Sequence, residues 1–190
     1  FASALTCLQR FAYRHVLILA QMREPEGRAS GDLIHVGLMH HYLGRMGEAH
    51  TDHIEAMRVA PARIAYCFER ARLIFESYRA RYATENWQIL AVEREFALPA
   101  GGLPYTQRVD LVVKLDGKVC AVDHKSGGRI EAANLQEHAT SGQFTGYEVL
   151  GRHVIAPKFG LPWGGCIVNA LRTQPPFGAT DSFRRVPLHV

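Results

Sequence analysis

The chain has 190 residues, of which 47% are hydrophobic and 21% are charged; these proportions are typical of a globular protein with a buried core. The formal net charge of +4 and the pI of about 9.0 weakly favour a polyanionic partner such as nucleic acid. The apolar run Val16–Ala20 is much shorter than the roughly 20 residues that span a bilayer, so we expect neither a transmembrane helix nor a membrane partner.

The first part of the chain is predicted to be helical. Apolar residues recur at helical spacing over residues 3–22 and again from about residue 31, where Asp32 is a candidate N-cap. The charged, Pro- and Gly-containing segment 23–31 between them predicts a loop. Residues 61–82 have the pattern of one long amphipathic helix.

The pattern then changes to the alternation of β-strands. Residues 89–96 alternate with period two, and the Pro/Gly-rich segment 99–104 predicts a turn. Two further β-rich runs, 107–115 and 118–125, are separated by Asp116-Gly117. The middle of the chain is therefore predicted to form three strands.

The last third of the chain is predicted to return to a helix and then to a strand. A helical stretch covers about 133–151, a Pro/Gly-rich loop 156–165 and an apolar strand 166–171, while the tail after Pro175 has no regular pattern. The order of helices, three strands, helix and strand predicts an α/β fold with a small mixed sheet flanked by helices.

The division of the chain follows from the same order. We expect a single domain over residues 1–190, with a helical part at 1–85 and a catalytic sheet core at 86–175. The four cysteines are far apart and form no CxxC pair, which argues against a zinc ribbon or a redox motif. Reduced thiols in the cytoplasm of a bacterial or phage-infected cell are the expectation.

The Asp116-Gly117 pair is the strongest local signal, because type I′ hairpin turns need positive φ at both central residues. A two-residue loop pairs Leu115 with Lys118, and counting back along both strands places Asp110 opposite Asp123. Directly opposed residues share a face of the sheet, with Cβ atoms about 4.5–5.5 Å apart. A bulged turn would stagger this pair.

Two carboxylates this close favour a shared proton or a bound cation. Hard oxygen ligands suit Mg²⁺ or Mn²⁺. Lys125 lies two residues past Asp123, hence on the same face, where an ammonium can orient a water or steady charge on a phosphate. On these residues alone, a solvated surface cluster in which Lys125 neutralises both acids is an equal alternative.

This hairpin resembles the core of the PD-(D/E)XK nuclease superfamily, and most closely its RecB-like exonuclease branch, whose pattern is G-x-x-D, a short hairpin and D/E-x-K. Asp110, Asp123 and Lys125 match that pattern, whereas Gln107 or Arg108 stands at the position of the family's glycine. The resemblance implies a restriction-endonuclease-like core.

Three further segments match the branch in the same order, so that the resemblance covers about residues 3–171. Gly31–His35 resembles the upstream G-x-x-x-H helix start. Gln143–Tyr147 resembles the Q-x-x-x-Y motif, whose amide and phenol lie on one helix face and are expected to contact DNA. Cys7–Arg14 is similar to the N-terminal C-P-x-x-F-x-Y-R helix, with Leu8 in place of proline.

The resemblance also implies the roles of the site residues. His35, Asp110, Asp123 and the backbone carbonyl of His124 are expected to hold Mg²⁺ or Mn²⁺, which lowers the pKa of a bound water and polarises the scissile phosphate. Asp110, Asp123 and Lys125 are the expected catalytic residues, with Lys125 positioning or activating that water.

Other residues have less decisive patterns. Glu93 is a candidate extra acidic ligand or an ordinary strand residue, and Arg10 and Arg14 are candidate DNA-backbone contacts or a solvated basic face. Without the motif order, His35 would be a buried histidine with a backbone partner, and Gln143 a polar residue on a helix face. His40, His41, His50 and His53 lack the H-E-x-x-H spacing and are interpreted as helix-surface residues.

Some branches of the superfamily bind an iron–sulfur cluster through one N-terminal and three C-terminal cysteines. Cys7 matches the first position, but only Cys166 lies near the end of the chain, so no cluster is expected.

The expected activity is metal-dependent hydrolysis of DNA ends or single strands by an exonuclease, with a role in recombination or repair and a recombination or helicase protein as a candidate partner. Residues 165–177 look like those of phage-encoded members. Two alternatives remain: a structure-specific endonuclease, and a non-catalytic DNA-binding module that retains the fold.

Overall fold

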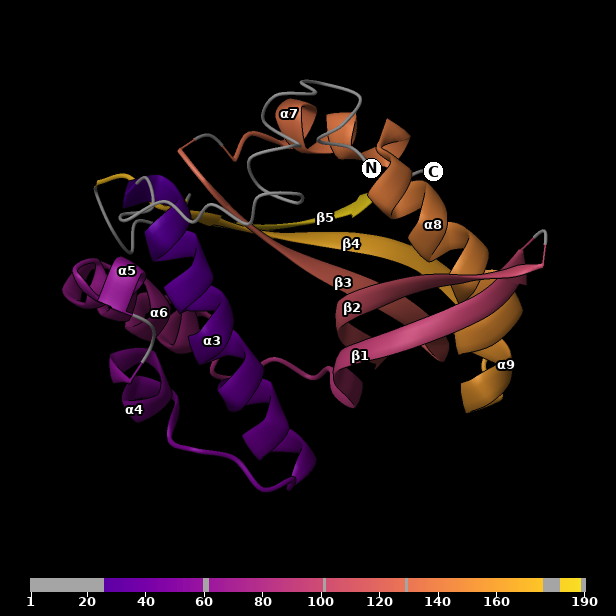
Figure 1. Ribbon diagram of the computed structural model, residues 1–190, viewed down its shortest axis with the longest axis horizontal. Helices are drawn as coiled ribbons and strands as arrows, with labels where there is room; N and C mark the ends of the chain where they lie inside the picture. Colours follow the sequence, from indigo (N-terminus) through magenta and orange to yellow (C-terminus); the bar gives the residue numbers. More distant parts are fainter. Residues whose placement is uncertain (1–25, 60–61, 101, 129, 176–181, 189–190) are drawn as a thin grey trace.

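The computed structural model describes residues 26–59, 62–100, 102–128, 130–175 and 182–188. Within these residues a mixed sheet lies between two groups of helices (Figure 1). The predicted helix 3–22, with Cys7, Arg10 and Arg14, lies outside the described residues. No helix in the described part of the chain is both long and apolar enough to cross a membrane.

The sheet has five strands in the order β1-β2-β3-β4-β5. They are β1 (Gln88–Ala100), β2 (Leu103–Leu115), β3 (Lys118–Gly127), β4 (Trp163–Arg172) and β5 (Phe183–Leu188). β3 and β4 are parallel and the other neighbours are antiparallel. The predicted α/β fold with a small mixed sheet is therefore confirmed.

The β2–β3 hairpin has the predicted register. Asp116 and Gly117 have φ of +49° and +76°, as a type I′ turn requires. Leu115 pairs with Lys118, and the ladder continues to Leu111 opposite Val122. The turn thus brings the segments that contain Asp110 and Asp123 side by side at the far end of the hairpin.

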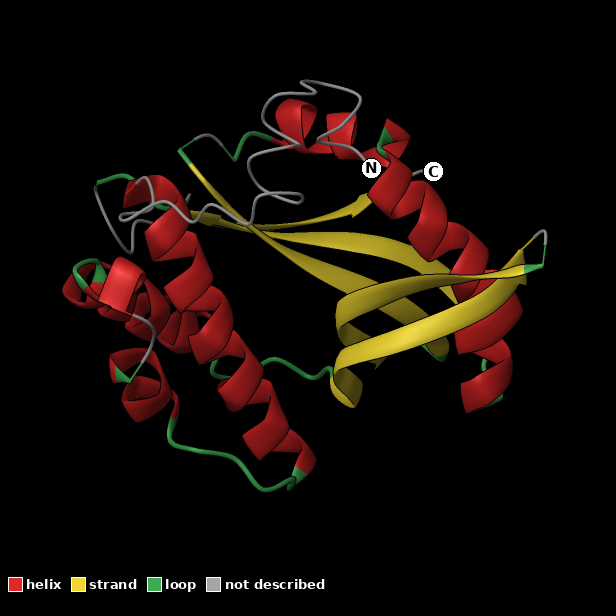
Figure 2. Cartoon of the chain, viewed as in Figure 1, coloured by secondary structure: helices red, strands yellow, loops and turns green. Residues whose placement is uncertain are grey.

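Helices cover both faces of the sheet, as Figure 2 shows. On one face lie α3 (Glu26–Met46), α4 (His53–Arg58), α5 (Ala62–Ala65) and α6 (Phe68–Arg81). The other face is covered by α7 (Ala132–Gln136), a 3-10 turn (Glu137–Thr140), α8 (Gly142–Leu150), a π-helical turn (Gly151–Ile155) and α9 (Ala156–Phe159).

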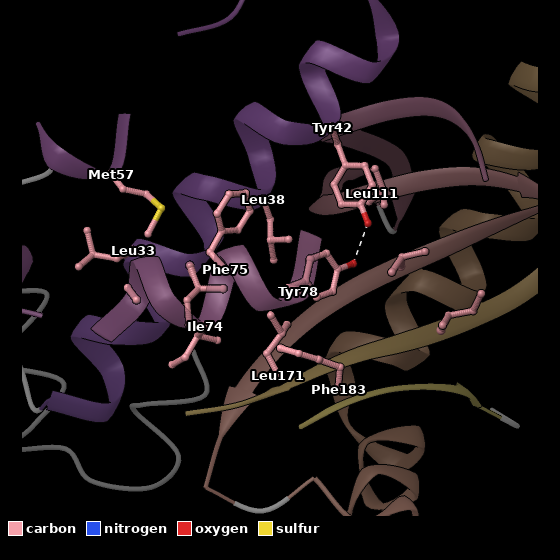
Figure 3. Packing of buried hydrophobic residues seen from close by; sticks show 14 of the residues in the cluster. Leu33, Leu38, Tyr42, Met57, Ile74, Phe75, Tyr78, Leu111, Leu171 and Phe183 are labelled. Carbon is pink, nitrogen blue, oxygen red and sulfur yellow. Dashed lines mark hydrogen bonds between the residues drawn. The ribbon is translucent and has the colours of Figure 1, made fainter. Parts of the chain in front are cut away.

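Each face has its own hydrophobic core. On the α3–α6 face, Leu33 and Leu38 of α3 and Phe75 of α6 pack with Leu111 of the sheet (Figure 3). On the other face, Phe144 and other residues of α8 pack against the sheet. Alternate residues of the β2–β3 hairpin serve the two cores, which accounts for its apolar sequence on both faces.

Several predicted boundaries are wrong. The segment 26–31, predicted as part of a loop, belongs to α3, so Asp32 lies inside that helix rather than at its N-cap. Ala29 and Ser30 are fully buried, and this packing overrides the local loop signal. The predicted helix 61–82 is broken between α5 and α6, where the Cys67 amide donates to Ile64 O instead of continuing the α-helical ladder.

The C-terminal half differs in the same way. The predicted helix 133–151 is interrupted by the 3-10 turn, and α9 occupies part of the predicted loop 156–165, with Pro157 at its start. The predicted turn 99–104 is narrower, because Pro99 and Pro104 are already paired in the sheet. The tail after Pro175 was predicted to be irregular, but β5 pairs with β4 and buries Phe183.

Candidate metal and nuclease site

Two acidic residues lie opposite each other in the β1–β2 ladder. The register on either side places Glu93 across from Asp110. Glu93 has a φ of +47°, a left-handed conformation that costs a non-glycine residue about 1–3 kcal/mol. Arg108 Nε lies 2.9 Å from Glu93 Oε2 and partly neutralises it. Strain of this kind beside paired acids is typical of functional sites.

His35 reaches the same acids from α3. A side chain on Gly31, one turn earlier, would collide with Ser126 Oγ, so glycine allows α3 to approach the end of β3 closely. His35 Nδ1 lies 3.8 Å from Asp110 Oδ2, and the imidazole is 33% exposed. Within the G-x-x-x-H segment, the glycine thus allows the close packing that places the histidine beside Asp110.

His35, Glu93 and Asp110 form a group that fits a divalent cation. One ligand atom from each residue lies within 4.8 Å of the other two. An imidazole nitrogen and two carboxylate oxygens suit Mn²⁺ well and Mg²⁺ acceptably. The sequence is consistent with Glu93 as a ligand or as an ordinary strand residue, and its position in this group favours the ligand.

The electrostatics of Asp110 also favour a cation. Burial, and next the negative charge of Asp123, raise the pKa of Asp110 to about 6. The nearby His35 and the backbone amide of His124 lower this pKa in part. A carboxylate that retains a raised pKa despite these partners lacks compensating positive charge, which a bound metal ion would supply.

Asp123 and Lys125 form a second group beside the first. Asp123 is 1% exposed, and Lys125 Nζ lies 2.6 Å from its Oδ2. Lys125 Nζ also donates to Gln143 Oε1 at 2.9 Å. The charge of Asp123 thus acts on Asp110, but Asp110 faces His35 whereas Asp123 faces Lys125.

Gln143 and Tyr147 lie on one face of α8, as their spacing predicts, and that face meets Asp123. Gln143 Nε2 donates to Asp123 Oδ1 at 2.7 Å. The Tyr147 hydroxyl lies 3.1 Å from the same oxygen and 3.0 Å from the Arg108 carbonyl. Tyr147 is 1% exposed, so its side chain orients Asp123 from inside the protein.

His124 joins the two groups through its backbone. Its amide donates to Asp110 Oδ2 at 2.8 Å, while its chain neighbours Asp123 and Lys125 both contact Gln143 of α8. Its imidazole lies on the α3–α6 face of the sheet, and burial lowers its pKa well below the usual value. A fixed His124 peptide therefore fixes the spacing of the two acids.

The site opens into two adjoining pockets. One, of about 430 Å³, is lined by His35, Glu93, Asp110 and neighbouring residues. The other, of about 560 Å³, lies between the start of α3 and the end of β3 and also includes His35. Asp32, predicted as a helix cap, lines both. Glu93 and Asp110 are thus accessible from outside, whereas Asp123 is buried.

The other histidines noted in the sequence lie elsewhere. His41 and His53 surround Phe75 on the far side of α3, with ring centroids 6.1 and 5.0 Å from that of Phe75. Burial lowers the pKa of His41 to about 4. These histidines are packing residues rather than part of the acidic site.

The fold and this site together define a metal-dependent nuclease class. The family model of the PD-(D/E)XK nuclease superfamily matches residues 1–174, and the chain belongs to that superfamily. No curated protein matches the chain. A solved structure titled "Crystal structure of SSO0001" aligns with 97% of this chain and 79% of its own at 15% identity, with a TM-score of 0.31, which supports no argument about function.

Proposed function

We propose that the protein is a Mg²⁺- or Mn²⁺-dependent deoxyribonuclease that acts as an exonuclease on DNA ends or single strands. The observation that carries this proposal is the group of His35, Glu93 and Asp110, whose ligand atoms lie within 4.8 Å of one another beside the Asp123–Lys125 pair. Superfamily membership and a pocket open to solvent support it.

The proposed ligands are His35, Asp110, Asp123 and the backbone carbonyl of His124, with Glu93 as an added acid. A bound divalent ion supplies an acidified water and a polarised phosphate. Gln143 and Tyr147 hold Asp123 Oδ1. To bind the ion, Asp123 would therefore only have to share its Oδ2 between the ion and Lys125. The acids would therefore be oriented before the ion binds.

Lys125 is proposed to act on the attacking water. In the structure its ammonium is held between Asp123 and Gln143. An ammonium fixed by two acceptors can donate to a water or to a developing negative charge on phosphate without losing its position. Gln143 thus serves the reaction by placing Lys125, in addition to any contact with DNA.

The finer assignment rests on the motif order. Gly31–His35, the hairpin and Gln143–Tyr147 support the RecB-like branch, and with it a role in DNA recombination or repair, a recombination or helicase partner, a cytoplasmic location and a phage origin. The DNA-backbone contacts proposed for Arg10 and Arg14 belong to the same assignment. A structure-specific endonuclease remains the second candidate, because nothing in the described site selects ends over internal bonds.

Cleavage of linear and covalently closed circular DNA, titrated with Mn²⁺ and Mg²⁺, tests the proposal. An exonuclease degrades only the linear form, whereas an endonuclease also opens the circle. Lys125→Ala should lower the rate by about 100-fold or more, while Lys118→Ala, at the exposed end of the same strand, should not. Binding of DNA without metal-dependent cleavage by the wild type would instead identify a non-catalytic module.

A further inference from the structure

The side chain of His124 is buried on the α3–α6 face of the sheet, away from the α8 residues that hold Asp123. It is 4% exposed and stacks on Tyr42 of α3, with ring centroids 5.8 Å apart and planes inclined by 6°. The His35 ring meets it edge-on at 5.8 Å. The residue between Asp123 and Lys125 is therefore anchored in the α3–α6 core.

A polar network continues from this imidazole into the core. Asn169 of β4, which is fully buried, places its Nδ2 2.8 Å from His124 Nδ1 and 2.9 Å from the Tyr78 hydroxyl. An amide nitrogen can only donate, so Nδ1 accepts and the His124 proton lies on Nε2. The Tyr78 hydroxyl in turn lies 2.7 Å from that of Tyr42 (Figure 3).

Arg185 of β5 closes the network from the edge of the sheet. Its guanidinium donates to the Tyr78 hydroxyl at 2.9 Å and to Asn169 Oδ1 at 3.4 Å. It also pairs with Glu85, which is 5% exposed, and lies 3.5 Å and 3.7 Å from the ring centroids of Tyr82 and Trp87. Arg185 thus has one fixed position, and Asn169 is oriented by it.

Stability alone does not account for this polar network. The partly buried Arg185–Glu85 ion pair and the fully buried Asn169 amide cost desolvation, and apolar residues of similar volume are often as stable or more stable. A satisfied network does give its members a single geometry. Such a geometry matters here because the His124 amide donates to Asp110 Oδ2 and its carbonyl is a proposed metal ligand.

We propose that Asn169 and Arg185 are positioning residues for the metal site, which hold the His124 ring and thereby the peptide that links Asp110 to the ion. The inference rests on the proposed metal-dependent activity. Neither residue touches the acids; each acts through His124. Arg185 lies in β5, in the tail that the sequence predicts to be irregular.

The test compares Asn169→Leu with Ile74→Ala in the full chain. Ile74 is buried in the same core, one turn from Tyr78, so its truncation lowers stability without touching the network. Mn²⁺ affinity is measured by titration calorimetry, and exchange of the His124 amide by NMR in EDTA. Asn169→Leu should weaken Mn²⁺ binding by about tenfold or more and speed exchange of that amide by about tenfold. Ile74→Ala should change the Mn²⁺ affinity and the exchange rate of that amide by less than about twofold, when the two variants are compared at equal free energy of unfolding.

Arg185→Met provides an independent variant if Asn169→Leu does not fold, because Glu85 retains its ion pair with Arg45. It should weaken Mn²⁺ binding in the same direction, and Arg185→Lys should restore part of the loss. Wild-type Mn²⁺ affinity and amide exchange in the folded variants would overturn this inference while leaving the nuclease proposal intact. Failure of the wild-type protein itself to bind Mn²⁺ would overturn the proposed function, and the positioning role with it.

Discussion

Neutralising Asp110 should stabilise the metal-free protein. The Asp110 side chain is only 15% exposed, and burial together with Asp123 raises its pKa to about 6. The Asp110→Asn variant keeps an oxygen that can accept the His124 amide but removes the charge. The comparison therefore isolates the cost of the carboxylate from the loss of a hydrogen bond.

The sign and size follow from the two pKa values. The folded protein binds the Asp110 proton more tightly than the unfolded chain, whose carboxyl has the ordinary value of 3.8. The charge therefore costs nothing below about pH 4, begins to lower the free energy of unfolding as pH rises, and has its full effect above about pH 6. A difference of about 2 in pKa corresponds to about 3 kcal/mol, which is the upper limit of the gain at pH 7.

Urea unfolding in EDTA at pH 4 and pH 7.5 measures this difference, with Glu137→Gln as the control for loss of an exposed carboxylate. Asp110→Asn should match the wild type at the lower pH and exceed it at the higher one. Saturating Mn²⁺ should reverse the order, since an ion at about 1,000 times its Kd adds about 4.1 kcal/mol to the protein that binds it, which exceeds the gain from removing the charge. An Asp110→Asn protein that is less stable than the wild type in EDTA at pH 7.5 would refute the reasoning.

Three other substitutions test separate parts of the site and the fold. Glu93→Gln should raise the Mn²⁺ concentration for half-maximal cleavage by about tenfold, whereas Glu95→Gln, exposed two residues on, should leave it unchanged. Tyr147→Phe should lower the cleavage rate severalfold, because the hydroxyl orients Asp123, and should leave the DNA affinity measured by fluorescence anisotropy unchanged. Weaker DNA binding at an unchanged maximal rate would favour the DNA contact expected from sequence. Gly151→Ala should lower stability by about 1–3 kcal/mol in thermal unfolding, because its Cβ would collide with the Trp163 ring; Gly142→Ala, with open space around it, should not.

The parts of the fold that depend on local signals were predictable from the sequence. The Asp116-Gly117 turn set the register of β2 and β3 down to Leu111 and Val122, because its backbone conformation is a property of those two residues. Helical spacing likewise placed Gln143 and Tyr147 on one face of α8. The element that this face would meet depends on tertiary packing, and no local pattern indicated that it would be Asp123.

Long-range pairing explains the main omission. β5 has two arginines and Pro187 in six residues, so it lacks the alternation that identifies a strand, and as an edge strand it can tolerate the proline. Its stability comes from pairing with β4 and from the burial of Phe183 and Leu188. The left-handed conformation of Glu93 could not be predicted for the same reason, since its neighbours in the fold impose this conformation and glutamate itself does not favour it.

The omitted strand changes how the site is understood. Spacing within D-x-K fixes which side chains share a face, but it does not fix how far the peptide between them lies from Asp110. That distance depends on His124, whose amide meets the acid and whose ring is held by Asn169. The acids are thus tied to a core built by α3, α6, β4 and β5. A chain that kept Asp110, Asp123 and Lys125 but lost this anchor would retain the motif without a firmly spaced site.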